Sequence, residues 1–86
     1  MNTPPESNER ARLRWLCRRG TKELDLLLTR FLDRAWDDAA PATRAAFARL
    51  LEFQDPDLYS MLTKRSAAPD PELADVVERI RATAGN

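Results

Sequence analysis

The sequence WLCRRGTKELD, residues 15–25, is the stretch that decides the fold. It predicts the end of one helix, a turn at Gly20 and the start of a second helix. Thr21 can cap the second helix by accepting a hydrogen bond from an unpaired backbone N–H in its first turn. Glu23 and Asp25 fall in that turn, where the helix dipole favours carboxylates. Gly20 is expected to end the first helix in a left-handed conformation, which glycine adopts at little cost.

The helix that begins at Thr21 has the strongest apolar pattern of the chain, with hydrophobic residues recurring every three or four positions. This spacing places one apolar stripe on a helix and predicts that the stripe is core. Its members are Leu24, Leu27, Leu28, Phe31, Leu32, Ala35 and Trp36. The same reasoning predicts helices at about 9–19, 21–36, 41–53, 56–64 and 71–84. Five short amphipathic helices with short links favour an all-α fold, a compact bundle.

Local signals define the ends of these helices and the extent of the domain. Residues 1–8 are expected to form a flexible N-terminal tail, because Pro4-Pro5 opposes helix formation. Residues 9–84 are expected to form a single helical domain. The expected cap residues are Ser7 or Asn8, Thr21, Ala40 (a poor cap), Asp55 and Asp70.

The composition excludes several classes of function. The chain has fourteen positive and fourteen negative side chains, and this net charge of zero argues against a general nucleic-acid or membrane binder. With no histidine and one cysteine, it lacks a zinc ligand set and a histidine-activated nucleophile, so we expect no enzyme. Cys17 lies on the apolar side of its helix and is expected to be a buried, inert thiol. No stretch resembles a transmembrane helix or a signal peptide, so a reducing, cytoplasmic compartment is the simplest expectation.

Positive charge is concentrated at the start of the chain. Residues 1–22 carry six positive and two negative side chains, whereas residues 23–63 carry four positive and eight negative ones. On a helical wheel, Arg12, Trp15 and Arg19 fall nearly opposite the apolar side of the first helix. A tryptophan flanked by arginines on a polar face is typical of an interface anchor. Alternatively, Trp15 packs against a neighbouring helix and the arginines extend past it into solvent.

Two separated motifs resemble those of one protein family. The first is CRRGTKELD at residues 17–25, which is similar to the Arg-Gly-x-x-Glu motif of the succinate dehydrogenase flavinylation (FAD assembly) factors, called SdhE in bacteria. The second is RLLE at residues 49–52, followed by DPDLY at residues 55–59 and then by Leu62. The family commonly has a tryptophan immediately before this leucine, and here the chain departs from the pattern with Met61.

The resemblance implies an assembly factor that binds the flavoprotein subunit of succinate dehydrogenase, or in some bacteria of fumarate reductase. Such a factor promotes covalent attachment of FAD to a histidine of that subunit, so it needs no cofactor of its own and the FAD belongs to the partner. A histidine-free helical domain can do this by stabilising a partner conformation that holds flavin and histidine close together. We expect a monomer when free. The resemblance and the charged face together indicate these partner-binding residues: Arg12, Trp15, Arg19, Gly20, Glu23 and Asp57.

Two other functions remain open from the sequence. One is a regulatory protein-binding module of antitoxin type, a label that members of this family have also carried. The other is a small helix–turn–helix DNA-binding domain, which the neutral charge disfavours. Binding to an immobilised flavoprotein separates the assembly factor from both, whereas salt-sensitive binding to random duplex DNA favours the last.

Overall fold

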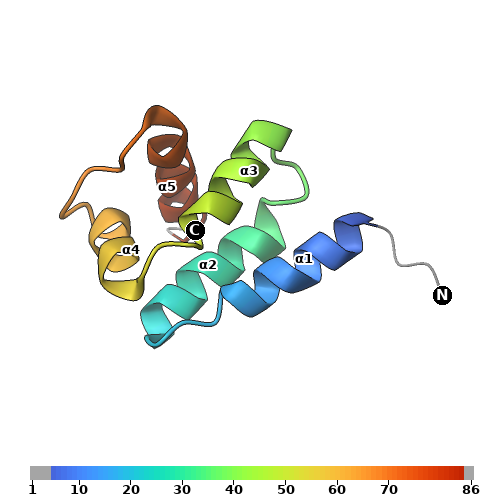
Figure 1. Ribbon diagram of the computed structural model, residues 1–86, viewed down its shortest axis with the longest axis horizontal. Helices are drawn as coiled ribbons and strands as arrows, with labels where there is room; N and C mark the ends of the chain where they lie inside the picture. The colour runs from blue at the N-terminus through green and yellow to red at the C-terminus, as the bar shows by residue number, and fades with distance from the viewer. Residues whose placement is uncertain (1–4, 85–86) are drawn as a thin grey trace.

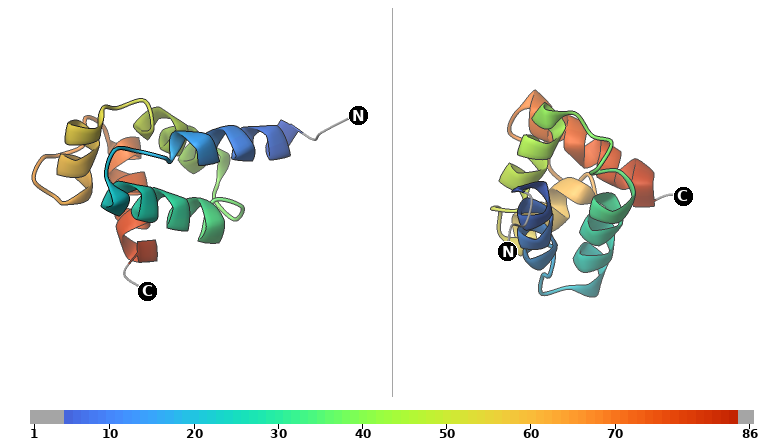
Figure 2. Two further views of the ribbon diagram at one scale, coloured as in Figure 1. Left: turned by 90° about the horizontal axis from the view of Figure 1, so that it is seen from below. Right: turned by 90° about the vertical axis from the view of Figure 1, so that its right-hand side faces the viewer.

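The computed structural model describes residues 5–84, and these form five helices joined by short links (Figure 1). The helices are α1 (Pro5–Leu16), α2 (Lys22–Arg34), α3 (Pro41–Leu50), α4 (Asp55–Leu62) and α5 (Pro71–Ala84). α5 packs against α2, α3 and α4, whereas α1 packs against α2 and runs antiparallel to it (Figures 1 and 2). The prediction of an all-α bundle is therefore confirmed.

The core is built from the stripes that the sequence predicts. Leu24, Leu28, Phe31 and Leu32 of α2 are all buried, and the Phe31 ring lies 4.8 Å from that of Phe47 on α3. α5 closes this layer with a stripe of four buried residues: Leu73, Val76, Val77 and Ile80. The strong pattern of α2 therefore reflects its place in the middle of the bundle, between α1 and α5.

The helix boundaries differ from the predicted ones at both ends of α1. This helix begins at Pro5, because the first position of a helix needs no backbone N–H and favours the fixed φ of proline. Ser7 and Asn8 therefore lie inside the helix and are not its cap, contrary to the prediction. The predicted tail overlaps the helix at residues 5–8, and its remaining residues 1–4 lie outside the described part of the chain.

α3 ends at Leu50, three residues before the predicted end, but the starts of the later helices follow the sequence signals more closely. Thr21 accepts a hydrogen bond from the Leu24 N–H at 3.2 Å, and Asp70 accepts one from the Leu73 N–H at 2.9 Å, so both are caps as predicted. Ala40 makes no side-chain cap bond, also as predicted. The prediction for α4 is wrong, because Gln54 occupies the cap position and Asp55 lies in the first turn with its carboxylate bound elsewhere.

Ionic contacts fasten α1 to the end of α2 and to the residues that follow it. Arg10 pairs with Asp37 at 2.7 Å, and Arg14 pairs with Asp33. These contacts matter because the start of α1 extends past the other helices (Figure 2). Trp36 lies beyond the end of α2 but is only 1% exposed, with the Arg44 guanidinium 4.1 Å from its ring centre. Trp36 is therefore core, as predicted, although the helix ends at Arg34.

Truncating Leu28 to alanine should lower the free energy of unfolding by about 2–5 kcal/mol, because the side chain is fully buried and a small core cannot close the cavity. Leu26→Ala, on the same helix but at a half-exposed position, is the matched control and should cost far less. Denaturant unfolding followed by circular dichroism measures both. Equal losses for the two variants would show that Leu28 is not a core residue.

Candidate partner-binding site

The link between α1 and α2 is organised by the side chain of Arg19. Because α1 ends at Leu16, the chain leaves the helical path before Arg19, and the side chain turns inward to 12% exposure. Its Nε donates to the Asp55 Oδ1 at 2.8 Å, and its Nη1 donates to the carbonyls of Leu16 (3.0 Å) and Leu51 (3.1 Å). Its Nη2 donates to the Phe53 carbonyl. The prediction that Arg19 shares an exposed face with Trp15 is therefore wrong, because a helical wheel does not apply beyond the end of the helix.

Gly20 is required by a close approach and not by its backbone conformation. Among the described residues no glycine has a positive φ, so the predicted left-handed cap is wrong. The Gly20 N–H instead donates to the Asp55 Oδ2 at 2.8 Å. A Cβ atom on Gly20 would lie 3.0 Å from the same oxygen, closer than carbon and oxygen ordinarily pack. A side chain at this position therefore requires the carboxylate to shift.

Asp55 joins the two sequence motifs into one structure. Both of its oxygens are used, Oδ1 by the Arg19 guanidinium and Oδ2 by the Gly20 N–H. The Gly20 hydrogen bond and then the Arg19 guanidinium hold the pKa of Asp55 below its ordinary value of 3.8. We call Arg19, Gly20 and Asp55 the turn clamp. It connects the link between α1 and α2 to the first turn of α4.

Two exposed apolar side chains lie on the helices that this link joins, one on α1 and one on α2. Among the described residues, the exposed large hydrophobic side chains are Trp15 (69% exposed) and Leu26 (48% exposed). They lie in neighbouring surface hollows that both include Thr29, one formed mainly by α1 and the other by α2. The sequence left two alternatives for Trp15, and its exposure excludes packing against a neighbouring helix. Arg18 lies beside it, 5.9 Å from the ring centre.

Most of the predicted site residues are exposed, but not all lie together. Trp15 lines the hollow formed mainly by α1, and Glu23 lines the hollow formed by α2. Gly20 is exposed in the link between the two helices, and Arg12 is exposed one turn before Trp15. Asp57 is exposed on α4 and lines neither hollow. We call Arg12, Trp15, Gly20, Glu23 and Leu26 the α1–α2 face. Leu26 was not predicted, although a leucine that lies off the buried stripe of its helix was a usable signal.

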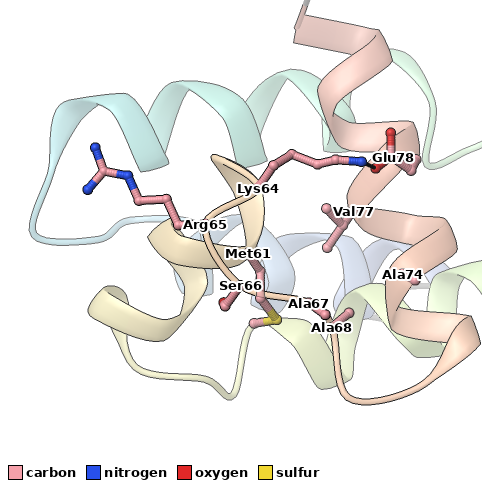
Figure 3. Close-up of a pocket in the computed structure, with 9 residues that line it drawn as sticks. All are labelled: Met61, Lys64, Arg65, Ser66, Ala67, Ala68, Ala74, Val77 and Glu78. Carbon is pink, nitrogen blue, oxygen red and sulfur yellow. Dashed lines mark hydrogen bonds and ion pairs between the residues drawn. The ribbon is translucent and has the colours of Figure 1, made fainter.

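A separate hollow between α4 and α5 contains none of the predicted site residues (Figure 3). Met61 and Val77 line it, and Lys64 reaches across to pair with Glu78 (Figure 3). Met61 is the position at which the chain departs from the family motif. Because it is only 4% exposed, the departure alters this hollow and the core beneath it and leaves the α1–α2 face unchanged.

The described residues contain no group of three or more side chains suited to holding a metal ion. Within the same part of the chain, no helix is both long and apolar enough to cross a membrane. Cys17 is a free, fully buried thiol, as predicted, and burial raises its pKa to about 12. The thiol therefore stays protonated at neutral pH and is a poor nucleophile.

Comparison with known proteins gives consistent matches over nearly the whole helical region. A family model described as the flavinator of succinate dehydrogenase matches residues 11–84. The FAD assembly factor SdhE of Shewanella oneidensis is 43% identical over 74 residues, which cover 86% of this chain and 90% of that protein. The SdhE protein of Methylococcus capsulatus is 42% identical over 78 residues, covering 91% and 94%. That of Idiomarina loihiensis is 41% identical over 69 residues, covering 80% and 77%.

Replacing Gly20 with alanine should destabilise the domain by about 1–2 kcal/mol, because the new methyl group forces the Asp55 carboxylate to shift and weakens its two hydrogen bonds. In an Asp55→Ala background the same replacement should be nearly neutral, since the obstructing oxygen is gone. Denaturant unfolding of the parent, the two single variants and the double variant gives the coupling energy between positions 20 and 55. If Gly20→Ala lowered the free energy of unfolding equally in both backgrounds, glycine would be required for its backbone conformation and not for the close approach of Asp55.

The contribution of Asp55 to stability should depend on pH. Its pKa is lowered in the folded state, so the stabilisation is complete well above 3.8 and is lost as the pH falls through the lower, folded-state pKa. The difference in unfolding free energy between the parent and Asp55→Asn should therefore be largest near neutral pH and shrink below about pH 3.8. Urea unfolding across this range measures it. A difference that grows on acidification would contradict the ionised pair.

Proposed function

The chain belongs to the family of succinate dehydrogenase flavinators, and from this premise we infer that it is an assembly factor for a flavoprotein. It binds the flavoprotein subunit of succinate dehydrogenase, or of fumarate reductase, and promotes covalent attachment of FAD. The observation that carries the proposal is the match of residues 11–84 to the family, together with an exposed tryptophan, Trp15, two residues before the first motif.

We propose the α1–α2 face as the surface that contacts the flavoprotein. Contiguous exposed apolar side chains mark interaction sites, and tryptophan and arginine are enriched among residues that contribute most to binding. Trp15 and Leu26 supply the apolar centre, and Arg12, Arg18 and Lys22 give its surroundings positive charge. This charge favours a partner surface with an acidic rim.

The remaining predicted residues have different parts in this proposal. Arg19 supports the link between α1 and α2 from inside, since its guanidinium is occupied by internal partners. Glu23 is exposed beside Leu26 and is available to a basic group of the flavoprotein. Asp57 lies outside the face and would contact the partner only at its edge.

The proposed mechanism is conformational, and the chain is proposed to act without catalytic groups or a cofactor of its own. By binding one arrangement of the flavoprotein more tightly than others, it raises the population in which FAD and the acceptor histidine lie close together. The partner's own groups then form the bond. We propose that the free protein is a monomer and acts in the cytoplasm, and the free thiol of Cys17 is consistent with a reducing compartment.

Trp15→Ala should weaken binding to the flavoprotein about 30-fold or more, as expected for a central interface aromatic worth at least 2 kcal/mol. The midpoint of thermal unfolding should change little, because the side chain is largely exposed. Binding to immobilised flavoprotein and flavin fluorescence of the denatured flavoprotein on a gel give the two readouts.

Arg65→Ala is the control for this experiment, because Arg65 is exposed in the link between α4 and α5, outside the α1–α2 face. It should leave both binding and covalent flavin unchanged. Normal binding by the Trp15 variant would remove the α1–α2 face from the proposal, and no gain in covalent flavin with the parent chain would remove the assembly function.

A further inference from the structure

We propose that Asp55 is a positioning residue for docking: it fixes the link between α1 and α2 so that Trp15 and Leu26 form one binding surface, without contacting the flavoprotein itself. The proposal rests on the proposed function and assigns a specific task to the second sequence motif. In this view the Arg-Gly-x-x-Glu motif and the Asp-Pro-Asp motif act as a single unit, although they are about thirty residues apart.

The backbone of the link depends on carboxylates that lie outside it. The N–H groups of Arg19 and Gly20 lie in the link, outside the backbone hydrogen bonds of both helices. The Arg19 N–H donates to the Asp25 Oδ1, and the Gly20 N–H donates to the Asp55 Oδ2. These two bonds favour the path of the link that brings both N–H groups within reach of a carboxylate.

Three helix ends meet at the turn clamp. The Arg19 guanidinium donates to the last carbonyl of α1, at Leu16, and to the carbonyl of Leu51, which caps α3. Asp55 opens α4 and supplies the negative charge that compensates this half-buried cation. Removing Asp55 leaves Arg19 without its ionic partner, so the guanidinium and the helix ends that it holds must rearrange.

This rearrangement reaches the α1–α2 face more directly than the core. Trp15 lies four residues before Arg19, and Leu26 lies on α2 a short distance after Gly20. α1 packs on α2, and the buried stripes of α2, α3 and α5 pack together without the clamp residues. Loss of Asp55 should therefore change the placement of Trp15 relative to Leu26 while the rest of the bundle stays folded.

Asp55→Ala tests the proposal, and Asp70→Ala is its matched control. Both aspartates precede a proline, bind an arginine and accept a backbone N–H, and their side chains are similarly exposed at 34% and 32%. We expect both variants to lose stability, but only Asp55→Ala to lose about tenfold in affinity for the flavoprotein. Hydrogen exchange at the Gly20 amide should accelerate in Asp55→Ala alone. Should this variant fail to fold, Asp55→Asn, which removes the charge and one of the two acceptor oxygens, replaces it with the same expectations.

A double-mutant cycle separates positioning from direct contact. If Asp55 acts through Arg19, the Arg19→Ala/Asp55→Ala double variant binds no more weakly than the weaker single variant. Additive losses would show that Asp55 touches the partner and would overturn the proposal. Unchanged affinity in Asp55→Ala, with the parent chain binding normally, would also overturn it. Failure of the parent chain to bind the flavoprotein would instead refute the proposed function and, with it, this inference.

Discussion

The ionic contact between Arg19 and Asp55 is the constraint on which the first third of the structure depends. α1 packs on α2, and the link between them contains too few residues to build a core of its own. The link is held instead by one guanidinium that reaches three carbonyls and by one carboxylate that is bonded on both oxygens. Each group neutralises the charge of the other. Removal of either leaves a partly buried charge with no ionic partner.

The remainder of the fold depends on apolar burial. α5 packs against α2, α3 and α4, and these four helices hold fourteen of the eighteen buried core residues in the described part of the chain. The protein thus combines a hydrophobic bundle with a first helix that adds polar contacts to the burial of Leu13. Polar contacts have strict geometry, so they can hold an exposed surface in one orientation without enlarging a core that is already small.

The sequence predicted those features that local chemistry determines. The apolar stripes of α2 and α5, the Thr21 cap and the buried Cys17 all follow from spacing and residue type, and the structure confirms them. The predictions from sequence were wrong where the partner of a residue lies far away along the chain. Aspartate is a typical helix-cap residue, so Asp55 was predicted to be a cap. Glycine is typical of a left-handed turn, so Gly20 was predicted to adopt one. Both are instead explained by their mutual approach across 35 positions, which no local pattern contains.

The candidate site was predictable to a similar degree. Trp15 and Glu23, which a motif and an amphipathic helix indicated, are exposed in the structure, and they stay predictions as partner-binding residues. Leu26, also exposed, stands outside any motif and was not predicted. Arg19 was assigned to the surface because the helix was expected to continue through it. Its burial follows from the end of α1 at Leu16, a boundary that the sequence placed three residues too late.

The two tryptophans occupy opposite environments, and this gives the protein two built-in optical probes. Trp36 is enclosed, with Arg44 against its ring, whereas Trp15 is surrounded largely by water. Ultraviolet emission from Trp36 therefore reports on the integrity of the bundle, and emission from Trp15 reports on what covers the outer side of α1. A chain that retains only one of them separates assembly of the fold from occupation of its surface, without any attached dye.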